Sequence, residues 1–273
     1  RDGTDLDAKH QVTVIVTDHK KAPQQGKNVA VKGDLGQSAA GKTDKNGELT
    51  VPEVEQTERH GVYIVGYTDG TFGPSRSMTR SEAAAIFARL LAEKNGDTIS
   101  TAANTKFADI PAHAWYSGYV KYLSNNGITY GKSKTIFAPN DAITRAEFTT
   151  MAVRFFDVYG DGDAEIMEQF SGFNDVSSGY WAAEYIKYAA LHGWINGYGD
   201  GSFHADREIN RAEVVTIVNR LLGREADEDY IADNLRKLNT FPDVTKRHWA
   251  YYAVMEAANA HTAVLGESES WSK

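Results

Sequence analysis

The sequence predicts a mainly α-helical protein made of three repeated helix pairs, preceded by a small all-β module. The strongest observation is internal repetition: three segments of about 66 residues, starting at Gly61, Gly127 and Gly193, align with one another. Within each segment, apolar side chains recur at the spacing of an amphipathic helix. Residues 1–58 lack this repeat and alternate apolar and polar side chains, which is typical of strands.

The N-terminal module is predicted from short alternating segments. "QVTVIVTD" alternates through Val12, Val14 and Val16, "NVAVKGD" continues the pattern, and "TDKNGELTVP" predicts a hairpin or tight turn. The stretch resembles bacterial Ig-like or prealbumin-like surface modules. Since an Ig-like sandwich takes about 100 residues, the module is expected to be small or truncated, and to act as a spacer that holds the anchor away from an effector domain. The charged segment "PEVEQTERHG" is the predicted linker.

Each repeat opens with a capped helix. A Thr or Asn at the N-cap is followed three residues later by Glu, which is the pattern of a capping box. The cap and glutamate pairs are Thr79 and Glu82, Thr144 and Glu147, and Asn210 and Glu213. A helix is therefore predicted to begin at each intervening arginine, and these are Arg80, Arg145 and Arg211.

A second, shorter helix follows in each repeat. It comes after an F-x-D element ("FADI", "FNDV", "FPDV") and begins near a Trp that lies eight residues beyond the Phe. The first two of these helices run to Gly127 and Gly193, which can take the left-handed position after a helix. One helix pair cannot bury both of its apolar stripes, so the three pairs are expected to share a core and form one cooperative unit.

These patterns predict the domain organisation. The predicted segments are the β module 1–58, repeats 61–126, 127–192 and 193–260, and a C-terminal tail 261–273. The chain opens with Arg1 and shows no signal-like segment, which is typical of a fragment or a processed product.

Residues 61–260 resemble the S-layer homology family. The resemblance rests on the order G-Y-x-D-G-x-F, T-R-A-E, F-x-D-V and W-A, repeated at fixed spacing. It implies three repeats around a pseudo-threefold axis, located at the bacterial cell wall. It also implies non-covalent anchoring of a surface protein to a secondary cell-wall polymer, commonly one that ends in pyruvylated N-acetylmannosamine.

A pyruvylated sugar carries a carboxylate, and the repeats offer groups that could bind it. A helix N-terminus supplies N–H groups and a positive dipole end, and an arginine there adds a charge-assisted contact. The Trp residues could cover a sugar face, the F-x-D aspartates could accept bonds from sugar hydroxyls, and the Gly-Tyr turns complete the groove. The predicted ligand-binding residues are Arg80, Arg145, Arg211, Asp109, Asp175, Asp243, Trp115, Trp181, Trp249, Gly66, Tyr67, Gly197 and Tyr198.

Each of these residues also has a purely structural interpretation. The arginines could pair with an acidic neighbour on an adjacent repeat, the Trp residues could belong to the core, and the aspartates could be helix caps. The turn glycines supply positive φ whatever the function.

The middle repeat departs from the other two. Its turn reads "TYGKSKTIF", which is interpreted as one residue longer than "GYTDGTF" and "GYGDGSF" and lacks their Asp and second Gly. The groove containing this turn is therefore doubtful. Arg80 and Arg211 are expected to matter more for binding than Arg145.

Composition narrows the remaining functions. The net charge of −8 does not favour a basic surface that could bind nucleic acid. No apolar run is close to the length of about 18 residues that a membrane-spanning helix needs. The chain has no cysteine, which excludes disulfides, zinc ribbons and thiol chemistry. No H-E-x-x-H or G-x-S-x-G motif occurs, so neither a catalytic metal nor a cofactor is predicted.

One segment is compared with a calcium loop. "DVYGDGDAEIME" places Asp157, Asp161, Gly162 and Glu168 at EF-hand positions, but Tyr159 occupies the third and breaks the pattern. A solvated loop between helices is predicted instead. The predicted function is a non-enzymatic envelope anchor. A protein-binding adhesion module and a glycan-acting enzyme are the alternatives, and self-association into a lattice is left open.

Overall fold

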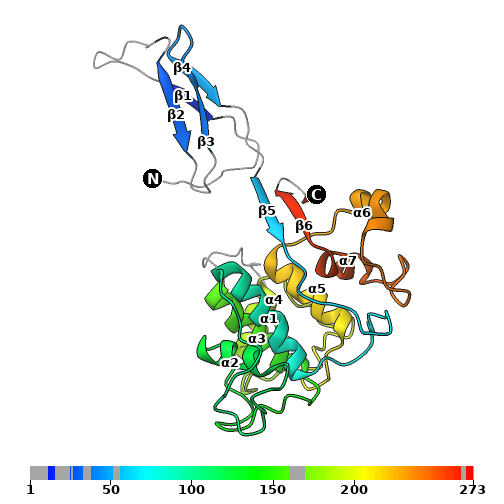
Figure 1. The fold of residues 1–273 in the computed structure, drawn as a ribbon. Helices are drawn as coiled ribbons and strands as arrows, with labels where there is room; N and C mark the ends of the chain where they lie inside the picture. The colour runs from blue at the N-terminus through cyan, green and yellow to red at the C-terminus, as the bar shows by residue number, and fades with distance from the viewer. Residues whose placement is uncertain are drawn as a thin grey trace. The chain divides into compact units, whose positions relative to one another are not determined.

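The computed structural model describes residues 12–15, 25, 27–32, 38–51, 56–159, 170–265 and 269–272. The chain forms two compact units (Figure 1). The first combines Arg1–His60 with His261–Lys273, and the second is Gly61–Ala260.

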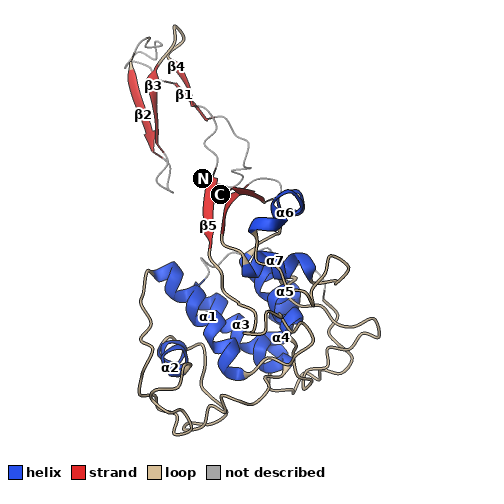
Figure 2. Cartoon of the chain, turned by 45° about the vertical axis from the view of Figure 1, so that its right-hand side comes forward, coloured by secondary structure: helices blue, strands red, loops and turns tan. Residues whose placement is uncertain are grey.

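The Gly61–Ala260 unit is helical. Its long helices each pack on the shorter helix that closes the same repeat, α1 on α2, α3 on α4 and α5 on α7. The helices are α1 (Arg80–Asn95), α2 (Ser117–Asn125), α3 (Arg145–Tyr159), α4 (Ala183–Leu191), α5 (Arg211–Leu222), α6 (Glu228–Asn234), the 3₁₀ helix η1 (Leu235–Lys237) and α7 (Tyr251–Ala258). The predicted helix pairs are thus present, and long irregular segments join them (Figure 2). Among the described residues, no helix is long and apolar enough to cross a membrane.

The long helices begin where the capping pattern predicts. In α1, the Thr79 side chain accepts from the backbone N–H of Glu82, and the Glu82 carboxylate accepts from the backbone N–H of Thr79. The same reciprocal pair is present in α5 between Asn210 and Glu213. Because both partners are local in sequence, this feature could be predicted without knowledge of the fold.

The three repeats meet in a closed ring of backbone hydrogen bonds. The N–H of Met78 donates to the carbonyl of Ile209 at 2.9 Å, Ile209 donates to Ile143 at 3.0 Å, and Ile143 donates back to Met78 at 2.9 Å. All three side chains are fully buried. This ring forms the pseudo-threefold axis, since each repeat contributes the equivalent residue just before its long helix.

The core is shared between repeats. The ring of Phe87 in α1 lies 5.3 Å from that of Phe148 and 4.9 Å from that of Phe155, both in α3. α5 also packs on α3. The apolar stripe of each long helix is therefore covered by a neighbouring repeat as well as by its own short helix, as the sequence predicts.

The other unit is built from strands. β1 (Val12–Ile15) pairs with β4 (Glu48–Val51), and β2 (Asn28–Lys32) pairs with β3 (Ser38–Lys42), both antiparallel. The described residues of the N-terminal module are thus β-structure. Its Ig-like or prealbumin-like character remains a prediction.

Two boundaries differ from those predicted. The predicted linker contains strand β5 (Gln56–His60), and the predicted tail contains β6 (His261–Leu265) and β7 (Ser270–Ser272), which form an antiparallel sheet in the order β5-β6-β7. The sequence could not predict this, because β5 is a short polar strand and its partner β6 lies about 200 residues away along the chain.

Candidate functional site

The arginine that begins each long helix pairs with the capping-box glutamate of another repeat, and the pairs close a second ring. The Nη1–Oε1 distances are 3.1 Å for Arg80 and Glu147, 3.3 Å for Arg145 and Glu213, and 3.8 Å for Arg211 and Glu82. The structural interpretation of the arginines, pairing with an acidic neighbour on an adjacent repeat, is therefore what the structure shows.

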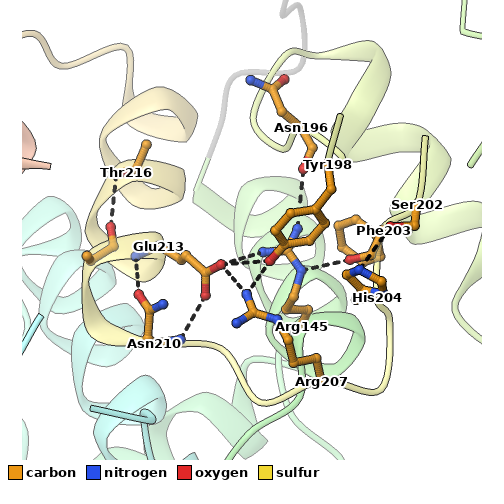
Figure 3. Close-up of polar contacts among 11 residues, drawn as sticks. Arg145, Asn196, Tyr198, Ser202, Phe203, His204, Arg207, Asn210, Glu213 and Thr216 are labelled. Carbon is orange, nitrogen blue, oxygen red and sulfur yellow. Dashed lines mark hydrogen bonds and ion pairs between the residues drawn. The ribbon is translucent and has the colours of Figure 1, made fainter. Parts of the chain in front are cut away.

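Each glutamate performs two tasks with its two oxygens. In Figure 3, Oε2 of Glu213 accepts from the backbone N–H of Asn210 at 3.0 Å and caps α5, while Oε1 accepts from Arg145. One residue thus fixes the start of its own helix and holds the arginine of the preceding repeat. This dual contact explains why arginine and glutamate recur together in the motif.

The guanidinium groups are buried and bonded to backbone as well as to glutamate. Arg145 donates through Nε to the carbonyl of Phe203 at 2.9 Å and through Nη2 to that of Asn196 at 3.2 Å (Figure 3). Arg211 donates likewise to Phe72 at 2.8 Å and Val65 at 2.7 Å. Burial lowers the pKa of both guanidiniums from their ordinary value, and neighbouring charges, including the paired glutamates, partly oppose this. We therefore expect their loss to destabilise the fold.

The helix N-termini are not free to bind an anion. The first two N–H groups of α3, those of Arg145 and Ala146, donate to the carbonyls of Arg207 at 2.8 Å and Ala205 at 2.9 Å. The third N–H, of Glu147, donates to the cap side chain. The helices α1 and α5 repeat this arrangement. The predicted contact between a ligand carboxylate and helix N–H groups is thus wrong, because neighbouring repeats already use these donors.

The F-x-D aspartates bond to backbone amides. Asp243 accepts from the N–H of Phe72 at 2.9 Å and of Gly73 at 2.7 Å, and so joins the last repeat to the turn of the first. The other two bind the next turn along the chain, Asp109 at Phe137 and Ala138 and Asp175 at Phe203 and His204. They are therefore not helix caps, and each carboxylate instead holds two backbone amides of a turn.

The Asp175 contact should make stability depend on pH. Burial raises the pKa of Asp175, but the N–H groups of Phe203 and His204 outweigh it, so the pKa lies below its ordinary value. The resulting stabilisation is present above the unfolded-state pKa of about 4 and is lost as the pH falls through the folded-state value. We expect the melting temperature of Asp175→Asn to lie below that of the parent at pH 7. This difference in melting temperature should become smaller below about pH 4. A melting-temperature difference that stays constant between pH 7 and pH 2 would contradict a pH-dependent contribution of Asp175 to stability.

The three Trp residues do not belong to the core. Trp115, Trp181 and Trp249 are 54%, 57% and 64% exposed. The core interpretation is therefore wrong, because more than half of each Trp residue is exposed to solvent.

Two grooves lie where an arginine meets the turn of the next repeat. The Arg145 groove has a volume of about 270 Å³, and the Arg211 groove about 200 Å³. The Arg145 groove is lined by Arg145, Ile195, Asn196, Gly197, Tyr198, Glu213, Thr216, Ile217, Arg220 and Trp249. The Arg211 groove is lined by Ile64, Val65, Gly66, Tyr67, Met78, Glu82, Ala85, Ile86, Arg89, Trp115 and Arg211. Of the predicted residues, each groove thus brings together an arginine, a Gly-Tyr turn and a Trp.

Tyrosine and arginine are in contact in both grooves. The guanidinium of Arg145 lies 5.1 Å from the Tyr198 ring centre, and that of Arg211 lies 4.7 Å from the Tyr67 ring centre. The hydroxyl of Tyr198 also donates to Glu213 at 3.0 Å (Figure 3). The Tyr residues therefore help to hold the Arg–Glu pairs in place.

The turn of the middle repeat was aligned wrongly from sequence. The N–H of Lys132 donates to the carbonyl of Ile136 at 2.8 Å, as that of Tyr67 does to Thr71 at 2.7 Å, so Gly131 corresponds to Gly66. The turn has no extra residue. It carries Lys132 in place of the tyrosine, and Lys132 pairs with Asp141 at 3.2 Å.

The ranking of the arginines changes as a result. Arg80 donates to the carbonyl of Phe137 at 2.7 Å and therefore faces the altered middle turn, whereas Arg145 faces the intact turn of the third repeat. Arg145 and Arg211, not Arg80 and Arg211, lie in the two grooves with Gly-Tyr turns.

A second arginine per repeat was missed. Arg89, Arg154 and Arg220 each lie nine residues after the first arginine, and Arg89 and Arg220 line the two grooves. Among the described residues, no carboxylate lies within ion-pair distance of any of the three. Their regular spacing in the sequence was the signal that could have found them.

The family comparison agrees with this geometry. The model of the S-layer homology domain matches residues 50–84, 106–149 and 172–215. The chain carries three S-layer homology repeats. The second and third matches begin at the F-x-D element and end in the next long helix, so these repeats are offset from the predicted boundaries at Gly127 and Gly193.

Several named proteins are similar to this chain over part of their own length. The chain is 34% identical to Cell surface glycoprotein 1 of Acetivibrio thermocellus over 77% of this chain and 9% of that protein. It is 30% identical to the Cellulosome-anchoring protein of the same organism, over 85% and 49%. It is 32% identical to the Surface-layer 125 kDa protein of Lysinibacillus sphaericus, over 58% and 13%. The repeats and these relatives indicate an extracellular, cell-surface location. The chain spans about half or less of each relative.

Proposed function

We propose that the three S-layer homology repeats anchor a surface protein non-covalently to a secondary cell-wall polymer. The Arg145 and Arg211 grooves would each bind one anionic sugar residue of that polymer. A pyruvylated amino sugar, which combines one carboxylate with an apolar C–H face of the ring, is the ligand that we propose. Cell-surface anchoring itself is supported by the repeats and by the named relatives.

The observation that carries this proposal is the placement of Arg220 and Arg89. Each lines a groove beside an exposed Trp, and neither has a carboxylate within ion-pair distance among the described residues. An arginine in that position offers a bidentate contact to a carboxylate, and the adjacent indole offers an apolar face to a sugar ring. The buried Arg145 and Arg211 are paired with Glu213 and Glu82, so Arg220 and Arg89 are the arginines proposed to meet the ligand carboxylate.

The size of the grooves favours a single sugar. Volumes of about 270 and 200 Å³ lie below the roughly 300–1,000 Å³ of sites for drug-sized ligands. Two or more such grooves on one chain would give avidity to a polymer that repeats the same sugar. The middle repeat, where Lys132 replaces tyrosine and pairs with Asp141, is proposed to bind more weakly or to select a different sugar.

The alternatives have less support. An enzyme would need one asymmetric cleft with a catalytic pair, whereas related grooves recur here around an axis. A protein-binding adhesion module would use the same exposed Trp residues, but it would not depend on the pyruvyl carboxylate. For the N-terminal strands, we propose a spacer of Ig-like type.

The test compares the two classes of arginine. We expect Arg220→Ala and Arg89→Ala each to weaken binding of a pyruvylated disaccharide about ten- to a hundredfold at their own groove, through loss of a charge-assisted contact. Lysine at either position should recover only part of this loss. The measurement is calorimetric titration, with a thermal melt of each variant.

The matched control is Arg236→Ala, which removes an exposed arginine in η1 outside both grooves. It should bind like the parent. Disaccharide without the pyruvyl group should bind weakly to all variants. If Arg220→Ala and Arg89→Ala both bind like the parent, or if the parent binds both disaccharides equally, the grooves do not recognise the carboxylate and the proposal is wrong.

A further inference from the structure

Two buried histidines face each other in the β5-β6-β7 sheet. His60 and His261 are direct partners in the antiparallel β5–β6 pairing, so their side chains project from the same face of the sheet. They are 3% and 7% exposed, and their ring centres lie 5.0 Å apart. Buried imidazoles in contact are uncommon in a surface sheet, where polar strands usually direct such groups to solvent.

A carboxylate from the end of the chain joins them. Oε1 of Glu269, just before β7, lies 3.3 Å from Nδ1 of His60 and 3.1 Å from Nε2 of His261. The Glu269 side chain is itself 5% exposed. Three ligand atoms, from three segments of one sheet, therefore converge within 4.8 Å of one another.

These separations match the edges of a metal tetrahedron. Zn²⁺ binds imidazole nitrogen and carboxylate oxygen at about 2.0–2.2 Å, so two ligand atoms in tetrahedral geometry lie roughly 3.3–3.5 Å apart. The observed 3.1 and 3.3 Å are close to this range before any adjustment of the side chains. We propose that His60, His261 and Glu269 form a binding site for Zn²⁺ or a similar divalent transition metal.

Neighbouring side chains orient the three ligands. Trp271 in β7 donates through Nε1 to Oε1 of Glu269 at 3.1 Å and stacks on the His261 ring, with centres 3.8 Å apart and planes 13° from parallel. Oε2 of Glu58 lies 3.8 Å from Nε2 of His60, on the side of the ring away from the ligand atom. Contacts of this kind fix the ring orientation of metal-binding histidines.

The donor set also selects the class of metal. Two imidazole nitrogens and one carboxylate oxygen are typical ligands of Zn²⁺ and other divalent transition metals. Ca²⁺ and Mg²⁺ instead prefer sites made of oxygen atoms alone. A bound metal would tie β5 to β6 and β7, which are separated by about 200 residues of chain. The site is thus expected to stabilise this sheet and to leave the sugar grooves unaffected.

The experiment uses the full chain after treatment with a chelator and its removal. We expect Zn²⁺ to bind with a saturable 1:1 component by calorimetry, and Co²⁺ to give the intense visible absorption of a tetrahedral site. His60→Gln and His261→Gln should each weaken this component by about a hundredfold or more, and Trp271→Phe by about tenfold. Zn²⁺ should also slow amide hydrogen exchange in β5 and β6.

The matched control is His204→Gln, which removes a histidine lying 3.8 Å from a carboxylate, that of Asp175, in the helical unit. It should leave Zn²⁺ affinity unchanged. The proposal is overturned if the parent shows no 1:1 component, or if His60→Gln and His261→Gln both bind Zn²⁺ like the parent. Trp271→Phe keeps an aromatic ring beside His261 but removes the Nε1–H that donates to Glu269. If Zn²⁺ affinity and Co²⁺ absorption were both unchanged in this variant, the described arrangement of the ligands would be contradicted.

Discussion

Arg211→Ala is expected to lower the free energy of unfolding of the helical unit by about 3–5 kcal/mol, the usual cost of breaking a buried ion pair. The substitution removes the partner of Glu82 and leaves the carbonyls of Phe72 and Val65 without their donor. For a unit of this size, the melting temperature should fall by about 6–20 °C. Arg211→Lys should recover only part of the loss, because an ammonium cannot reach all three acceptors.

The control for this prediction is Arg220→Ala, nine residues further along the same helix. Arg220 is exposed, so its loss should change stability by no more than about 0.5 kcal/mol while weakening sugar binding. The measurement is thermal and denaturant unfolding of both variants. If Arg211→Ala unfolds like the parent, the ring of Arg–Glu pairs does not stabilise the fold.

Gly197→Ala is expected to destabilise the third repeat by about 1–3 kcal/mol and to weaken binding in the Arg145 groove. A Cβ atom at this position would lie 2.5 Å from Cε1 of Phe173 and 2.7 Å from the carbonyl oxygen of Ser202. The backbone oxygen belongs to the hydrogen bond that closes the turn, so it cannot move away without opening the turn.

The same turn provides a matched control. At Gly199, an added Cβ would meet no heavy atom within 4 Å. We expect Gly199→Ala to leave stability within about 0.5 kcal/mol of the parent or to raise it slightly. The two variants should be compared by denaturant unfolding and by titration with the sugar. Equal stability of the two variants would show that close backbone approach at Gly197 is not required.

The sequence alone was sufficient to predict features whose interacting residues lie close together along the chain. The capping boxes, the start of each long helix at an arginine and the glycines Gly127 and Gly193 with positive φ are all as predicted. The shared core also followed, because an amphipathic helix pair exposes a stripe that only a neighbour can cover. The calcium-loop comparison lies largely outside the described residues, at Asp161, Gly162 and Glu168.

The sequence was insufficient where the partner lies in another repeat. Whether an arginine binds a ligand or a glutamate depends on what faces it, and Arg145 faces Glu213 only once the ring has closed. The same reason explains the role of Asp243, which bonds to amides about 170 residues away in sequence. The exposure of Trp249 could not be predicted either, since a Trp at the start of an amphipathic helix is usually buried.

The metal site was missed for a related reason. Short motifs detect histidines that share one helix or loop, whereas His60, His261 and Glu269 come together only through the pairing of β5 with β6 and β7. A polar strand whose partner is distant gives almost no signal in the sequence.

The closed hydrogen-bond ring of Met78, Ile143 and Ile209 fixes the number of repeats at three. In an open solenoid, copies can be added or lost at either end, and the terminal copies fray because each has a neighbour on one side only. Here every copy has two neighbours, so no terminus frays first, and a fourth copy would have no vacant edge to join. A surface protein with this architecture can therefore gain further attachment points only by acquiring a second complete trio, not by extending the first.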